Sequence, residues 1–151
     1  MKISWTSPRA AGFSLVELML VVLLLGILLL VAVPSWQAQL LKGRRLLAVS
    51  ALQELHMRQA QYFLHVRRYA PSLEALGYPQ DSLAVRDDGE VVPVPGEGRL
   101  YRLSLTPQGA AAYLLTAEAV GAQARDTACR RLTLNATGRR GAAPGAVAEC
   151  W

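Results

Sequence analysis

Residues 12 to 34 read GFSLVELMLVVLLLGILLLVAVP and contain one charged side chain, that of Glu17. From Phe13 to Val33 every other residue is apolar or small, and a helix of this length extends for roughly 32 Å. The hydrocarbon core of a bilayer is about 30 Å thick. We therefore predict a membrane-spanning helix over residues 13–34, and the acid near its start requires an explanation.

Two ordinary interpretations of this segment leave Glu17 unexplained. A simple membrane anchor has no use for the acid, because a charged carboxylate in hydrocarbon costs about 2.5 to 3.5 kcal/mol on insertion scales. A cleavable secretory signal has an apolar region of about 7 to 15 residues, whereas Leu18 to Val33 is sixteen residues without a charge. Pro34 also stands where a signal peptidase needs an extended bond.

The string Gly12–Glu17 follows a short basic leader and precedes an unbroken apolar helix, and it resembles the class III signal of type IV prepilins. The resemblance implies that a membrane peptidase removes residues 1–12 by cutting between Gly12 and Phe13, and that Phe13 is then N-methylated. Glu17 becomes the fifth residue of the mature chain, a position that the family keeps acidic. In a bundle of subunits, the new amine of a neighbour can pair with this carboxylate and set the axial register.

Gly26 and Pro34 fall where pilins of this class also carry a helix-weakening glycine and proline. Proline removes a helical hydrogen bond and costs about 3 kcal/mol, and glycine costs about 1 kcal/mol relative to alanine. The resemblance implies a helix that can unwind between these positions in a filament. A simple kink in a membrane helix is the other interpretation.

Beyond Pro34 the pattern becomes amphipathic over residues 35–68. Apolar residues recur there at helical spacing: Leu41, Ala48, Leu52, Leu55, Tyr62 and Val66. No turn signal interrupts this pattern, so we predict one helix from Phe13 to about Arg67. Its second half should pack on a small sheet.

The remaining segment, residues 69–151, predicts a β-sheet head. Residues 99–106 and 113–119 alternate between apolar and polar side chains around a turn, which is typical of a hairpin. A third strand is expected over residues 130–134, residues 135–138 should form a turn, and residues 91–98 indicate a loop or edge structure. Ser72 can cap a helical turn that Gly77 ends. The predicted fold class is α+β, a type IV pilin fold with an antiparallel sheet.

Cys129 and Cys150 are the two cysteines of the chain. An even pair in a chain that looks exported favours a disulfide, provided that the head faces an oxidising compartment. The segment RDTACRRLTLNATGRRGA, residues 125–142, also resembles the C-terminal region of PilE-type minor pilins, in which the two cysteines are bonded. Two cysteines without nearby histidines do not make a metal site, and no cofactor is expected.

The resemblance implies a structural minor subunit of a type IV pilus. Its partners would be other pilin subunits through the N-terminal helix, prepilin peptidase, the pilus assembly platform and the inner membrane. The chain would reside in the bacterial inner membrane and then in an extracellular pilus that serves adhesion, twitching motility or DNA uptake. His56 and His65 are nine residues apart and form no metal pair, and no nucleophile is set beside a base, so an enzyme is not expected.

Two other functions share these features. A pseudopilin of a type II secretion system has the same N-terminal motif, although the C-terminal cysteine pair favours the pilus system. A DNA-binding competence pilin is the second alternative, because the chain has a formal net charge of +5 and arginines can neutralise phosphates. The candidate contacts are Arg125, Arg130, Arg131, Arg139 and Arg140. No aromatic residues interleave with them, and such a cluster is usually a solvated face.

Overall fold

The computed structural model describes residues 14–94 and 98–151. The leader, residues 1–12, and the cleavage and methylation positions Gly12 and Phe13 lie outside this range. The chain forms two compact units, residues 1–38 and 39–151, and we describe each by itself.

One long helix, α1 (Leu15–Val66), confirms the predicted helix, whose expected ends were Phe13 and about Arg67. It continues through Gly26 and Pro34 without interruption, so unwinding between these two positions stays a prediction. In the first unit its apolar side chains are exposed, with Leu15 at 74% and Leu30 at 77%. Among the described residues, no helix has the length and apolar character needed to cross a membrane.

The second unit contains one six-stranded antiparallel sheet in the order β2-β1-β3-β4-β5-β6. Its strands are β1 (Leu83–Arg86), β2 (Val91–Pro93), β3 (Arg99–Pro107), β4 (Tyr113–Ala119), β5 (Arg131–Asn135) and β6 (Arg140–Ala143). The predicted hairpin is β3 and β4, and the third predicted strand is β5. The sequence analysis missed β1 and β6 as strands, and it described β2 only as loop or edge, because these strands are short and contain few alternating residues.

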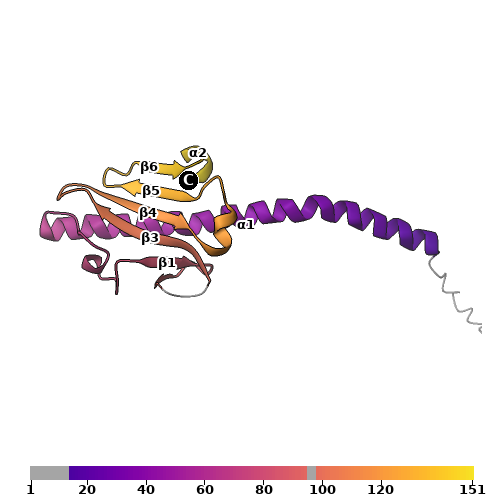
Figure 1. Ribbon diagram of the computed structural model, residues 1–151, viewed down its shortest axis with the longest axis horizontal. Helices are drawn as coiled ribbons and strands as arrows, with labels where there is room; N and C mark the ends of the chain where they lie inside the picture. The colour runs from indigo at the N-terminus through magenta and orange to yellow at the C-terminus, as the bar shows by residue number, and fades with distance from the viewer. Residues whose placement is uncertain (1–13, 95–97) are drawn as a thin grey trace, which may run out of the picture. The chain divides into compact units, whose positions relative to one another are not determined.

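The core of this unit lies between the sheet and the second half of α1, which runs across one face of the sheet in Figure 1. Ala48, Leu52 and Leu55 of the helix are buried, as the helical spacing predicts. Alternation along β3 and β4 directs Tyr101, Leu103, Tyr113, Leu115 and Ala117 toward the same core. Burial of these apolar side chains supplies the main stabilisation of the head.

Short helical turns and loops complete the head. In η1 (Glu74–Leu76), Ser72 Oγ accepts a hydrogen bond from the Ala75 N–H at 3.2 Å, and Gly77 ends the turn with φ +90°, as predicted. The turn after β5 also forms: Asn135 Oδ1 accepts hydrogen bonds from the N–H groups of Thr137 and Arg139. The other two short helices are η2 (Gly121–Arg125) and α2 (Val147–Cys150).

Candidate functional site

Arginines gather at one end of the sheet, which we call the arginine end. There β1 ends at Arg86, opposite the start of β3 at Arg99. On the other side of β3, β4 runs toward the same end, where its Glu118 lies between Arg102 of β3 and Arg131 of β5. Segments that are distant in sequence therefore present their basic side chains together.

Three charged residues form a row on the outer face of the sheet. Arg102 is the register partner of Glu118, and Glu118 is the register partner of Arg131. Because Tyr101 and Leu103 point into the core, Arg102 points away from it. Arg131 Nη2 lies 3.6 Å from Glu118 Oε1, and both side chains are about half exposed. Such an exposed pair contributes roughly 0 to 1 kcal/mol, so Arg131 can change partner at little cost.

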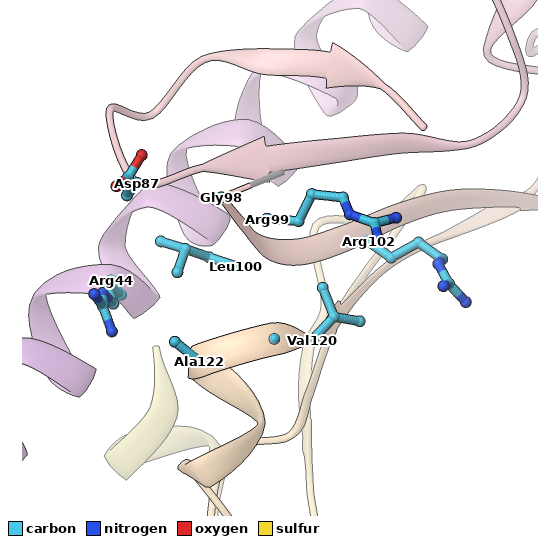
Figure 2. A pocket seen from close by; sticks show the side chains of 9 residues that line it. Arg44, Asp87, Gly98, Arg99, Leu100, Arg102, Val120 and Ala122 are labelled. Carbon is cyan, nitrogen blue, oxygen red and sulfur yellow. The ribbon is translucent and has the colours of Figure 1, made fainter. Parts of the chain in front are cut away.

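A hollow of 410 Å³ opens at this end. Its charged lining residues are Arg44 from α1, Asp87 from the β1–β2 turn, and Arg99 and Arg102 from β3. In Figure 2, Asp87 and Arg44 lie on one side of Leu100, and the side chains of Arg99 and Arg102 extend from β3 on the other side. The hollow thus combines three guanidinium groups and one carboxylate, and guanidinium groups bind phosphates in a bidentate manner.

The wall formed by η2 depends on Gly121. The Val120 N–H donates a hydrogen bond to the Leu100 carbonyl at 2.8 Å, which brings η2 against the start of β3. Gly121 has φ +55°, and a Cβ at this position would lie 2.7 Å from the Arg99 carbonyl oxygen. Only glycine permits this approach without displacement of the backbone.

The structure separates the five arginines that the sequence analysis proposed as DNA contacts, of which Arg125 is the last residue of η2. Arg130 and Arg131 lie at the arginine end, but Arg139 and Arg140 lie at the opposite end of the β5–β6 hairpin, where Leu134 is the register partner of Arg140. Each strand residue advances the chain by about 3.3 Å, so the length of β5 separates the two pairs. The Arg140 guanidinium lies 5.2 Å from the centre of the Trp151 ring.

The additional basic residues at the arginine end were not identified from sequence. Arg102 could have been found, because alternation along residues 99–106 places it on the polar face of that strand. Arg44 and Arg99 carried no such signal, since the pairing of β1 with β3 and the position of α1 bring them to the hollow.

A buried polar cluster lies beneath this end of the sheet. Asp126 is 3% exposed, and its Oδ1 lies 2.8 Å from Arg45 Nη2 of α1. Gln123, which is fully buried, donates hydrogen bonds from Nε2 to the Tyr101 hydroxyl at 3.1 Å and to the Leu41 carbonyl at 3.2 Å. The hydrogen bonds that Arg45 donates to the Asp126 carboxylate raise the pKa of Arg45, and burial raises the pKa of Tyr101 to about 12.

The same cluster attaches the C-terminal segment to the helix. Cys129 and Cys150 form the predicted disulfide, with their Cα atoms 5.6 Å apart. The Cys129 N–H donates a hydrogen bond to Asp126 at 3.4 Å, and Arg45 Nη1 donates one to the Glu149 carbonyl at 2.9 Å. One ion pair therefore holds the chain beside both cysteines.

The two histidines lie away from the arginine end. His56 Nδ1 is 2.7 Å from the Tyr113 hydroxyl, and His65 is exposed near the end of α1. No group of three potential metal ligands was found among the residues with described positions. The absence of enzymatic activity stays a prediction.

A match to a known protein family includes the residues of the arginine end. Residues 34–133 match the family described as "Type IV minor pilin ComP, DNA uptake sequence receptor", and residues 7–33 match the "Prokaryotic N-terminal methylation motif". The chain belongs to the ComP family of type IV minor pilins. The pilin fold described above agrees with this membership, and the family description itself names a DNA uptake sequence receptor.

Individual pilins are also similar to this minor pilin. It is 32% identical over 78 residues to the type IV major pilin protein PilA of Myxococcus xanthus (strain DK1622). That match covers 52% of this chain and 36% of the relative, so the chain spans about a third of the relative's length. A solved structure of a type IV pilin from Shewanella oneidensis is similar with a TM-score of 0.49 and 20% identity, over 74% of this chain and 97% of that one.

Proposed function

We propose that this minor pilin binds DNA during its uptake, and that the arginine end of the sheet is the contact surface. The family description supports a role in DNA uptake. The observation on which the proposal rests is the register that brings Arg102 of β3 and Arg131 of β5 into one row on the outer face.

The spacing of this row suits a phosphate backbone. Neighbouring strands lie about 4.8 Å apart, so Arg102 and Arg131, two strands apart, have backbones separated by about 10 Å. Arg99, at the start of β3, and Arg130, next to Arg131, add positive charge at the same end of the sheet, and an arginine stands at each end of the row. Each phosphate that a guanidinium neutralises releases condensed counterions, so binding is strong at low salt and weakens steeply as salt is added.

The salt dependence of binding tests this surface directly. The purified, disulfide-bonded protein is titrated against labelled duplex DNA at several salt concentrations. Loss of two phosphate contacts in the double variant Arg102→Gln/Arg131→Gln should reduce the slope of log K against log salt by about 1.8.

The double variant Arg139→Gln/Arg140→Gln is the matched control, because it removes the same charge at the other end of the β5–β6 hairpin. It should leave the slope within about 0.5 of the wild-type value. A larger change in this control than in the Arg102 and Arg131 variant would place the contact elsewhere, on the residues that the sequence analysis named.

Processing and assembly complete the proposed function. Prepilin peptidase cuts between Gly12 and Phe13, Phe13 is N-methylated, and residues 13–34 hold the subunit in the inner membrane through apolar side chains until other pilin subunits take it into the filament. The match of residues 7–33 to the N-terminal methylation motif supports this sequence of events. Mass spectrometry of sheared filaments should detect a mature chain that begins with methylated Phe13, and a chain that retains residues 1–12 would refute it.

A further inference from the structure

The hollow at the arginine end contains one residue that works against phosphate binding. Asp87 adds a carboxylate to the lining that Arg44, Arg99 and Arg102 contribute to, and its Oδ1 would lie 3.8 Å from a Cβ at Gly98. A carboxylate repels phosphate, so Asp87 weakens the general affinity of this surface for nucleic acid. An acid in a basic site needs a reason of its own.

The fold of the β1–β2 turn does not supply that reason. The next residue, Asp88, makes the side-chain contacts within the turn. Its Oδ1 accepts a hydrogen bond from the Glu90 N–H at 2.9 Å, and its Oδ2 lies 3.6 Å from Arg86 Nη2. Within the described residues, Asp87 forms no ion pair and its carboxylate accepts no hydrogen bond. Among these residues, none competes with a ligand of the hollow for this carboxylate.

We propose that Asp87 reads a base and gives this DNA contact a preference for cytosine. The inference rests on the proposed function. The arginines around the hollow hold phosphates of the DNA backbone, and the Asp87 carboxylate accepts a hydrogen bond from the exocyclic N4 amino group of cytosine. Among the base edges in the major groove, this amino group is the donor that an aspartate or glutamate typically recognises.

Repulsion and recognition together produce the preference. Where the hollow meets a base edge that presents only acceptors, the carboxylate stays unpaired beside the negatively charged backbone and the complex is weakened. Where it meets a cytosine amino group, the hydrogen bond offsets this repulsion. Phosphate contacts position the protein, and a contact to a base edge specifies the sequence.

The test uses the full disulfide-bonded chain and a pool of random duplex DNA. Bound molecules are selected and sequenced, and dissociation constants are then measured for a selected duplex in which each C·G pair is changed to T·A in turn. For the wild type, one such change should weaken binding about 5- to 100-fold. In Asp87→Ala the same change should alter affinity by less than about twofold, with binding to unselected DNA unchanged or tighter.

Asp88→Asn is the matched control, since it removes one negative charge at the adjacent position and keeps an acceptor for the Glu90 N–H. It should retain the cytosine preference. If the wild type binds DNA without a preference for cytosine, or if Asp87→Ala keeps that preference, the role of Asp87 is refuted while DNA binding stands. If the wild type binds no DNA at all, the proposed function itself fails.

Discussion

Arg45 is a charged residue of α1 whose side chain is largely buried. It is not among the apolar residues that recur at helical spacing along α1, yet its side chain is 14% exposed and pairs with Asp126, whose side chain is 2% exposed. Removing two charges from water is costly, and the pair persists because further hydrogen bonds satisfy both partners. The pair holds α1, η2 and the C-terminal segment together.

Breaking this pair should destabilise the head more than removing any exposed salt bridge. Arg45→Met leaves Asp126 buried without its counter-charge, so we expect the free energy of unfolding to fall by about 3 to 5 kcal/mol. Urea denaturation of the purified chain measures this change. Arg58→Met is the control, because the Arg58–Glu54 pair is roughly half exposed and its loss should cost less than about 1 kcal/mol. Equal losses in both variants would mean that the Arg45 pair is not effectively buried.

The raised pKa values of two buried tyrosines predict how the free energy of unfolding changes with pH in the alkaline range. Burial raises the pKa of Tyr101 and of Tyr113 to about 12, whereas an unfolded tyrosine has a pKa of about 10. The native state then retains protons that the unfolded state releases, so stability is complete below pH 10 and falls as the pH rises from about 10 to 12. Urea midpoints across this range measure the decline, and Tyr113→Phe should reduce its steepness by about half. A midpoint that is constant to pH 12 would contradict this assignment.

At the scale of single elements, η2 illustrates a short segment that is positioned by its neighbours. It follows β4, forms one wall of the hollow, and approaches β3 closely enough that Gly121 has no room for a side chain. Its own sequence, Gly121–Arg125, contains good helix formers but is too short to be a stable helix by itself. The element is therefore held by the backbone hydrogen bond from Val120 to Leu100 and by the buried side chain of Gln123.

Two glycine substitutions should have opposite effects on stability. Gly121→Ala introduces a side chain at φ +55° and 2.7 Å from the Arg99 carbonyl oxygen, so we expect a loss of about 1 to 3 kcal/mol. Gly43→Ala, in α1, adds a methyl group that meets no atom within 4 Å, and the better helix propensity of alanine should add about 0.5 to 1 kcal/mol. Thermal unfolding compares both variants with the wild type. A stabilised Gly121→Ala protein would show that η2 can move away from β3.

At the scale of the whole molecule, the two units present different kinds of surface. The head buries its apolar side chains, whereas α1 in the first unit exposes them along its length. A pilin surface of this type is suited to contact with lipid or with the helices of other subunits. We propose that Glu17, the single acid in this segment of the sequence, controls how subunits are aligned.

Glu17→Gln should impair assembly without unfolding the head. The neutral side chain no longer pairs with the amine of a neighbouring Phe13, and that amine is left without a counter-charge in an apolar environment. We expect the yield of sheared filaments to fall about tenfold or more, as loss of about 1.4 kcal/mol per contact would produce. Glu74→Gln, on an exposed turn of the head, is the control and should assemble normally. Normal filament yields with Glu17→Gln would refute the pairing.

Periodicity in the sequence was sufficient to predict the features that depend on nearby residues. The long apolar and then amphipathic pattern predicted a helix that the structure bounds at Leu15 and Val66, and alternation predicted the β3–β4 hairpin and β5. The GFSLVE motif indicated the family, and the two cysteines indicated their bond. These signals are local because side-chain direction repeats every 3.6 residues in a helix and every two in a strand.

The features that combine distant segments required the fold itself. Arg45 and Asp126 are 81 positions apart, and nothing in either local pattern relates them. Arg102 and Arg131 lie in one row only because of the register of β3, β4 and β5. The register of β5 with β6 separates Arg131 from Arg140. Strands β1, β2 and β6 have too few residues to establish an alternation, so their pairing partners determine them. Burial and cross-strand pairing are properties of the assembled head, and for this reason the arginine end and its hollow were visible only in three dimensions.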